Sequence, residues 1–251
     1  MTAPPRFFCA PVNAPERIFA LPPKVAHHAV HVLRLTVGEP LTLFDGTGGE
    51  YPAQIVTLNR GKVEVRLGQH CPIERESPLS IHLAQTLQSG EKMDYTLQKA
   101  VELGVTAFLP LTGRRSVSRL DKERAEKRRA RWQEIAISAC EQCGRNRIPE
   151  IKPIIPLENW LREMGKKGEK LPGLKLLLLP DAKPRFSTLK RPAPDTPITL
   201  LIGAEGGFDP LEIEAAHAAG FCPVQLGSRT LRTETASLAA LAILQGLWGD
   251  A

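Results

Sequence analysis

A glycine-rich loop follows one of the most apolar stretches of the chain. Ile198 to Ile202 is a short apolar run typical of a buried parallel strand, and it leads into Gly203-Ala204-Glu205-Gly206-Gly207. A helix is predicted next, because Asp209 can cap it, Pro210 suits its first position and Glu212 can complete a capping box. Glycines there let backbone amides approach a ligand closely, beyond the carboxyl end of a strand. The loop is therefore a candidate binding site, and the alternative is a tight turn with a purely structural role.

A second polar loop precedes the last helix. A strand is predicted to end at Leu226-Gly227, and the loop after it carries Arg229 and Arg232. Thr233 is expected to cap the helix that runs from there to Trp248. Because that helix is nearly all Ala, Leu and Ile, it must be buried on most sides. It forms either the centre of the domain or a contact with a second subunit.

Positive charge is concentrated in one segment. The formal net charge of the chain is +6, and the segment from Gly113 to Arg131 has an excess of the same size. Such a stripe suits a polyanion such as nucleic acid. The alternative is a solvated helix with i,i+4 ion pairs, for example Glu123 with Lys127. The basic residues of this stripe are Arg114, Arg115, Arg119, Lys122, Arg124, Lys127, Arg128, Arg129 and Arg131.

Other ligand signatures are weak or missing. Gly46-Thr47-Gly48-Gly49 fails the dinucleotide pattern because Tyr51 occupies its last position, and the chain has no P-loop and no HExxH motif. Cys140 and Cys143 form a single Cys-x-x-Cys on a predicted helix, which favours plain thiols. His27 and His31 lack a third ligand nearby. We therefore expect no metal site.

The predicted secondary structure changes after about the first third of the chain. Short strands, one helix over 26–35 and a hairpin joining 54–58 to 62–67 predict a compact β-barrel module, followed by a linker over 71–78. Beyond it, strands and helices alternate, which predicts an α/β sheet with helices on both faces. The predicted strands are 79–87, 105–111, 174–179, 198–202 and 223–226, and the predicted helices are 91–103, 121–143, one after Asp209 and 233–248.

Composition narrows the class of protein. The chain has 251 residues, of which 42% are hydrophobic and 24% charged, values close to globular averages. No apolar run approaches the roughly 20 residues of a membrane helix, and the first residues lack a signal peptide. Five cysteines without an export signal suggest reduced thiols. We expect a soluble cytoplasmic protein that does not contact a membrane.

Several motifs together match a known family. The pairing of GAEGGF, from residue 203, with LGSRTLRTETA, from residue 226, resembles the RsmE-type ribosomal RNA methyltransferases of the SPOUT superfamily. One departure is Ala204, where that family more often has Pro. Further matches cover almost the whole chain: His27-His28 with Val32-Leu33-Arg34, Lys92-Met93-Asp94 to Glu102-Leu103-Gly104-Val105, Arg115-Ser116-Val117, and Glu141-Gln142-Cys143-Gly144-Arg145 with Pro149.

The resemblance implies both a fold and an activity. Such proteins transfer a methyl group from S-adenosylmethionine to N3 of one uridine in small-subunit (16S) ribosomal RNA. The implied architecture is a PUA-like, RNA-binding β-barrel over 1–72 and a SPOUT methyltransferase domain over 79–251. That domain would contain a deep trefoil knot, an exception to the rule that folds are unknotted. The implied assembly is a homodimer.

The resemblance also assigns roles to individual residues. Arg232 is the candidate group that stabilises charge on the uracil ring, and Glu205 is the second candidate catalytic residue. Contacts with RNA are expected from His28, Arg34, Arg114, Arg115, Arg119 and Arg145. The expected cofactor-binding residues are Leu178, Leu179, Pro180, Ile202, Gly203, Glu205, Gly206, Gly207, Leu226, Gly227, Leu231, Thr233 and Ala236.

Two other functions fit parts of the pattern. A ribose 2′-O-methyltransferase acting on tRNA or ribosomal RNA would use the same cofactor. A non-catalytic module would dock RNA through the barrel and the basic stripe alone. Binding of S-adenosylmethionine distinguishes the enzymes from the module, and the position of the methyl group distinguishes base from ribose.

Overall fold

The computed structural model describes residues 3–10, 18–59, 62–115, 121–166 and 173–251. Contacts divide the chain into two compact units. The N-terminal unit comprises Met1–Glu76 and Ile137–Ile148, and the C-terminal unit comprises Ser77–Ala136 and Pro149–Ala251. Each unit is described by itself. No helix among the described residues is long and apolar enough to cross a membrane.

The N-terminal unit is built on a five-stranded sheet. Its strand order is β1-β3-β4-β5-β2, in which β1 runs parallel to β3 and the other neighbours are antiparallel. The predicted hairpin is confirmed, since β4 pairs with β5. Within the described residues β1 and β2 form the sheet's two edges, so the strand pairing there is that of an open mixed sheet. The strands are β1 (Arg6–Phe8), β2 (Ile18–Ala20), β3 (Pro40–Phe44), β4 (Tyr51–Asn59) and β5 (Lys62–Leu67).

Alternation along these strands forms the core of the unit. Leu41, Leu43, Val63 and Val65 are at most 1% exposed, because every second side chain of a strand points to the same face. The predicted helix over 26–35 begins and ends earlier in the chain and has two parts, α1 (Pro23–His27) and a π-helical turn η1 (His28–Val32). This unit has the mixed sheet expected of a PUA-like module, with its short helices close to the sheet.

A cluster of charged side chains ties 145–147 to the rest of the N-terminal unit. Glu50 accepts hydrogen bonds from Arg6 Nη1 at 2.6 Å, Arg75 Nη1 at 3.0 Å and Asn146 Nδ2 at 3.2 Å. Partial burial raises the pKa of the Glu50 carboxyl, but these hydrogen bonds outweigh it and hold the pKa below its ordinary value. A buried carboxylate kept ionised in this way fixes the cluster electrostatically.

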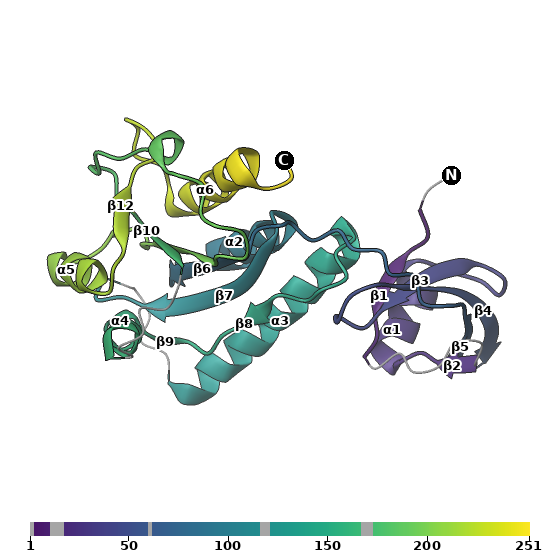
Figure 1. The fold of residues 1–251 in the computed structure, drawn as a ribbon. Helices are drawn as coiled ribbons and strands as arrows, with labels where there is room; N and C mark the ends of the chain where they lie inside the picture. Colours follow the sequence, from purple (N-terminus) through teal and green to yellow (C-terminus); the bar gives the residue numbers. More distant parts are fainter. Residues whose placement is uncertain (1–2, 11–17, 60–61, 116–120, 167–172) are drawn as a thin grey trace. The chain divides into compact units, whose positions relative to one another are not determined.

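The C-terminal unit is a seven-stranded parallel sheet. Its order is β12-β10-β11-β6-β7-β8, and β9 also pairs with β7 (Figure 1). The elements are β6 (Ile81–Thr86), α2 (Lys92–Glu102), β7 (Val105–Thr112), α3 (Lys122–Cys143), β8 (Glu150–Ile151), β9 (Ile155–Pro156), α4 (Leu157–Lys166), β10 (Leu174–Leu178), η2 (Phe186–Thr188), β11 (Ile198–Ile202), α5 (Pro210–Ala218), β12 (Cys222–Val224) and α6 (Thr233–Trp248). The predicted strand–helix alternation is confirmed, whereas β8, β9, α4 and η2 were not foreseen.

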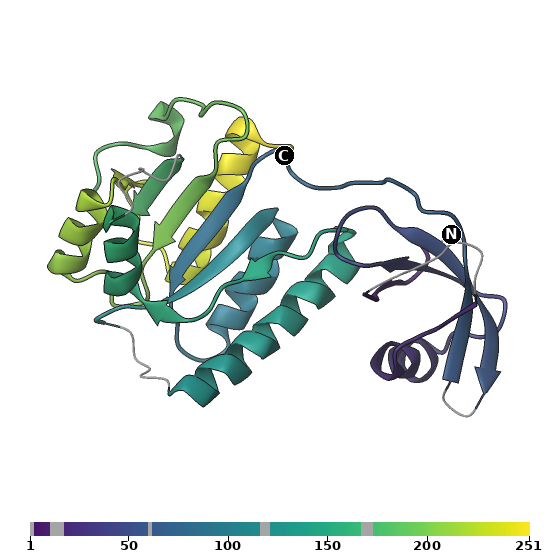
Figure 2. The same cartoon turned by 60° about the horizontal axis from the view of Figure 1, so that its bottom comes forward.

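Helices cover both faces of this sheet, as the alternation predicted (Figure 2). Ala84 of β6 packs in one apolar cluster with residues of α4 and α5. Its neighbour Gln85 faces the opposite way and accepts a hydrogen bond from Ser237 of α6. Because successive strand residues point to opposite faces, α4 and α5 cover one face and α6 covers the other. The α6 helix also packs against α2.

Candidate functional site

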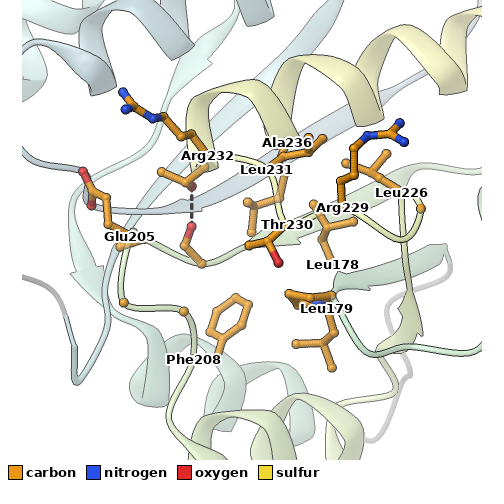
Figure 3. A pocket seen from close by; sticks show the side chains of 18 of the residues that line it. Leu178, Leu179, Glu205, Phe208, Leu226, Arg229, Thr230, Leu231, Arg232 and Ala236 are labelled. Carbon is orange, nitrogen blue, oxygen red and sulfur yellow. Dashed lines mark hydrogen bonds between the residues drawn. The ribbon is translucent and has the colours of Figure 1, made fainter.

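A cavity of about 570 Å³ lies at the carboxyl ends of three neighbouring strands, β10, β11 and β12. The loops after these strands surround it (Figure 3). Every residue that the sequence predicted for cofactor binding lines this one cavity. The lining consists of Lys92, Leu178, Leu179, Pro180, Ile202, Gly203, Ala204, Glu205, Gly206, Gly207, Phe208, Leu226, Gly227, Arg229, Thr230, Leu231, Arg232, Thr233 and Ala236.

The glycine loop forms a tight turn on one side of the cavity. The amide of Gly207 donates to the carbonyl oxygen of Ala204 at 2.9 Å, and Gly207 has a φ of 64°, which a residue with a side chain adopts only with strain. Gly203 is constrained differently, since a Cβ there would lie 3.3 Å from the backbone of Gly207. The sequence thus uses glycine for backbone conformation at one position and for close approach at another.

The helix after this loop begins as the sequence predicted. The Asp209 side chain accepts from the amide of Leu211 at 3.1 Å, and the Glu212 carboxylate accepts from the amide of Asp209 at 2.8 Å. Pro210 occupies the first turn, so the capping box is complete. A fixed helix start holds the carboxyl end of the glycine turn in place.

Glu205 is held by the loop between β6 and α2. Its Oε1 accepts hydrogen bonds from Ser89 Oγ at 2.7 Å, the Ser89 amide at 3.2 Å and Lys92 Nζ at 3.2 Å. Partial burial raises the pKa of the Glu205 carboxyl, but these hydrogen bonds and one from its own backbone lower the pKa to about 2. Glu205 is therefore a stable anion and a very weak base.

The start of α6 differs from the prediction. Arg232 is the residue that precedes the helix, and no side chain caps it. Thr233, expected as the cap, is instead the first helical residue, and its hydroxyl donates to the carbonyl oxygen of Gly203. The prediction of a Thr233 cap was wrong because this hydroxyl, 7% exposed, bonds across to the neighbouring loop. It thereby joins two walls of the cavity.

Arg232 is exposed at the rim of the cavity. Its side chain lies on the same side as Glu205, while Arg229 lies on the other (Figure 3). Across the described ranges, no ion pair links Arg232 to Glu205 or to Glu234. The guanidinium is thus not committed to holding these loops in shape.

A buried polar network under the cavity was missed by sequence reasoning. Gln85 is fully buried, and its Nε2 lies 3.3 Å from the carbonyl oxygens of Ile202 and Gly203. Its Oε1 accepts from Ser237 Oγ at 2.6 Å. Gln88, which precedes α2, and Thr96 of α2 extend the network. The available signal was a glutamine directly after Leu83 and Ala84 in a predicted strand, where unpaired burial would be costly.

Five lining residues were also outside the predicted set. Ala204 and Phe208 flank the glycines directly, and Arg229 and Thr230 lie in the second predicted loop, so adjacency could have found them. Lys92 is the first residue of α2, far away in the sequence. Its signal was only its place in the motif at the start of α2.

The predicted RNA-binding residues belong to both units. His28 and Arg34 are exposed on the N-terminal unit, and Arg34 has a strained φ of 57°. Arg114 and Arg115 are exposed after β7, whereas Arg119 lies outside the described residues. Arg145 differs from the expectation: it is 4% exposed, and its Nε lies 3.0 Å from Glu76 Oε2. Its geometry is that of a buried structural ion pair.

The basic stripe is partly neutralised by its surroundings. On α3, Lys127 pairs with Glu123 at 2.7 Å, as the solvated-helix alternative predicted. Arg124 pairs with Asp121 at 3.3 Å, and Arg128 lies over the ring of Trp132. The stripe still carries more basic than acidic residues.

The described residues give little support for a reactive thiol or for a metal site. Burial raises the pKa of the Cys140 thiol to about 12, so it stays protonated. No group of three or more His, Cys, Asp or Glu side chains within those ranges is arranged to hold a metal ion.

Comparison with known proteins identifies the family. A family model described as an RNA methyltransferase domain matches residues 75–245, and one described as an RNA methyltransferase PUA domain matches 21–68. The ribosomal RNA small subunit methyltransferase E of Buchnera aphidicola is 35% identical over 94% of this chain and 93% of its own length. The chain belongs to the ribosomal RNA small subunit methyltransferase E family.

Solved structures of similar proteins agree with this membership. The methyltransferase E of Neisseria gonorrhoeae, bound to S-adenosylmethionine, has 40% identity, a TM-score of 0.89 and 99% coverage of both chains. A Legionella pneumophila methyltransferase in complex with the same cofactor has 38% identity, a TM-score of 0.92 and full coverage of both. The C-terminal unit has the parallel-sheet fold of these methyltransferase E structures, and the trefoil knot stays a prediction.

Proposed function

We propose that this protein transfers a methyl group from S-adenosylmethionine to N3 of a uridine in small-subunit (16S) ribosomal RNA. The observation that carries the proposal is the single cavity at the ends of β10, β11 and β12. All thirteen residues that the motifs had nominated for cofactor binding line it. Relatives of similar sequence are named as small-subunit ribosomal RNA methyltransferases, and two similar structures hold the cofactor.

The cavity suits this cofactor in size and chemistry. Its volume falls within the usual range of about 300–1,000 Å³ for small-molecule sites. Leu178, Leu179, Leu226 and Leu231 provide apolar walls for a flat base, and the glycine turn exposes backbone groups for polar contacts. When bound, S-adenosylmethionine supplies an electrophilic methyl group on a sulfonium. We assign the thirteen predicted residues to its binding.

The residues around the cavity suggest how the uridine is activated. N3 of uridine carries a proton and is a poor nucleophile, so the site must favour its loss and stabilise the resulting anion. Arg232 supplies a permanent, uncommitted cation at the rim for that charge. Glu205, with a pKa of about 2, does not accept the proton. We assign Glu205 to holding Lys92 at the cavity wall, 3.2 Å from its carboxylate.

RNA binding is assigned to surfaces outside the cavity. Basic side chains of α3, together with Arg114 and Arg115 after β7, face solvent and suit phosphates. On the N-terminal unit, His28 and Arg34 are exposed beside the π-helical turn. Arg34 keeps a strained backbone conformation, which is commonest at functional positions.

We infer that the active form is a homodimer in the cytoplasm, where ribosomal RNA is found. One face of α6 supports the dimer, since Leu247 is 42% exposed and Ala242 is exposed as well. Ile243 between them is only half-buried. An apolar helix face left uncovered in one chain is suited to contact a second copy.

Two measurements test the proposed function. Calorimetry with S-adenosylmethionine should show binding, whereas a non-catalytic RNA module would show none. Purified protein, small-subunit RNA and labelled cofactor should then yield a methyl group on uracil N3. A methyl group on ribose would instead establish the 2′-O-methyltransferase alternative.

A further inference from the structure

The segment after β7 contacts the outer side of the glycine turn. Arg115 Nη1 donates a hydrogen bond to the carbonyl oxygen of Gly206 at 3.0 Å. The two residues are also packed closely, because a Cβ on Gly206 would lie 3.3 Å from Arg115 Cβ. Gly206 does not have a positive φ, so a side chain there would crowd this neighbour without straining the backbone. Arg115 does not line the cavity itself.

A buried carboxylate anchors this segment to the start of α5. Glu212 is 5% exposed, and its Oε1 accepts from the amide of Arg114 at 2.7 Å. Its Oε2 accepts from the amide of Asp209 at 2.8 Å. Glu212 therefore joins the residue before Arg115 to the residue that follows the glycine turn and Phe208. Such charge-assisted hydrogen bonds are stronger than neutral ones.

These contacts hold the glycine turn at two positions. From outside, Arg115 holds Gly206, and at the turn's end Glu212 holds Asp209. Glycine loses more conformational freedom on ordering than any other residue, and the turn contains three glycines. A turn that is already ordered binds a ligand more tightly, because it loses less conformational entropy when the ligand binds.

We propose that Arg115 is a positioning residue for cofactor binding, which acts by holding the glycine turn in its binding shape while Glu212 anchors the segment that carries it. The inference rests on the proposed function, since it takes the cavity to be the S-adenosylmethionine site. It gives Arg115 a role that is independent of RNA, although its sequence context placed it in the basic stripe.

The test is calorimetric titration of S-adenosylmethionine into Arg115→Ala in the absence of RNA. Cofactor affinity should fall about 2- to 10-fold, the range for one lost hydrogen bond of ordinary net strength. Arg115→Lys should recover part of the affinity, because an ammonium can still donate to the Gly206 carbonyl. In turnover assays at saturating RNA, the loss should appear in KM for the cofactor. Because Arg115 is exposed, the variant should melt like the wild type.

Arg162→Ala is the matched control. It removes another exposed guanidinium from the same unit, one that pairs with Glu158 on α4. Its cofactor affinity should equal that of the wild type. Glu212→Gln provides a second variant: its amide group would place an N–H against a backbone N–H, and cofactor affinity should fall at temperatures where the protein is still folded.

The outcomes are distinct. If the wild type binds the cofactor and Arg115→Ala binds it equally well, the positioning role is wrong. The role is also wrong if Arg162→Ala loses as much affinity, since the effect would then be one of overall charge. A wild-type protein that binds no S-adenosylmethionine would refute the proposed function itself.

Discussion

At the scale of single residues, the two adjacent glycines of the turn have different reasons to be glycine. Gly207 has open space around a missing Cβ but a φ of 64°, whereas Gly206 has an ordinary φ and Arg115 close by. Backbone conformation therefore favours glycine at Gly207 and not at Gly206. Substitution at Gly206 tests packing alone.

Gly206→Val should impair cofactor binding in a folded protein. The added branched side chain must displace Arg115 or the turn, because even a Cβ would lie at 3.3 Å. We expect at least about fivefold weaker S-adenosylmethionine binding by calorimetry, from a clash of the usual 1–3 kcal/mol. Gly165→Val, with open space around its Cβ position on α4, serves as the control. Undiminished affinity in folded Gly206→Val would mean that the turn is not part of the cofactor site.

Arg232 should act on the transition state. Arg232→Ala should lower kcat by about 10²–10³, equivalent to about 2.7–4 kcal/mol, while S-adenosylmethionine affinity stays near wild type. Lys should not substitute well, because it lacks the planar fork that grips two acceptors. Single-turnover rates at saturating RNA, measured beside calorimetry, check both quantities. Cofactor affinity that falls as far as turnover would show that Arg232 is a structural clamp.

Glu205 should not control the pH dependence of the reaction. With a pKa of about 2, its carboxylate is ionised throughout the range from pH 5 to 9. Its favourable contribution is present above its ordinary pKa and is lost only as pH falls towards 2. Glu205→Gln should therefore lower the rate at most about fivefold, the value of one exposed ion pair, without changing the shape of the pH profile. An acid limb that the wild type has and Glu205→Gln lacks would identify Glu205 as the base.

At the scale of elements, helix starts show how far local sequence determines structure. The start of α5 was predictable because Asp209, Pro210 and Glu212 interact within one turn. The start of α6 was not, because the Thr233 hydroxyl bonds to Gly203, thirty residues earlier in the chain. The start of a helix can be predicted from local sequence when the groups that hydrogen-bond to it are close in the sequence.

The α3 helix carries the prediction for RNA affinity. Replacing Arg124, Lys127 and Arg128 together by Ala should reduce the slope of log affinity against log salt. Each lost phosphate contact lowers the slope by about 0.7–0.9. Filter binding or fluorescence anisotropy across a salt series measures this, with Arg162→Ala as a single-charge control. A slope equal to that of the wild type would mean that these three side chains make no phosphate contacts. The α3 helix would then be a solvated helix with its own ion pairs.

At the scale of the whole molecule, the sequence predicted the alternation of strands and helices. It also predicted most of the residues that line the cavity at the ends of β10, β11 and β12. The motifs lie in loops directly after strands, and parallel strands place such loops at one edge. Pairings between distant segments were not predictable. Glu212 with Arg114 and Gln85 with Ser237 are each joined by contacts that no local pattern records.

The division of the chain into two units also depends on contacts between segments that are distant in the sequence. Contacts group 137–148 with the N-terminal unit, although these residues follow directly on 122–136 of the same helix. A boundary drawn along the sequence, at 72 and 79, makes no provision for this segment. Arg145, expected at an RNA surface, is buried there because its guanidinium pairs with the carboxylate of Glu76, which is distant in the sequence.

The most direct test of the central claim is mass mapping of small-subunit ribosomal RNA from cells that lack this protein. One uridine should lose a methyl group that fragmentation places on the base at N3. Wild-type protein should restore it, whereas Arg232→Ala should restore little of it within the same time. Small-subunit RNA with an unchanged set of N3-methylated uridines in the deletion strain would contradict the proposed function.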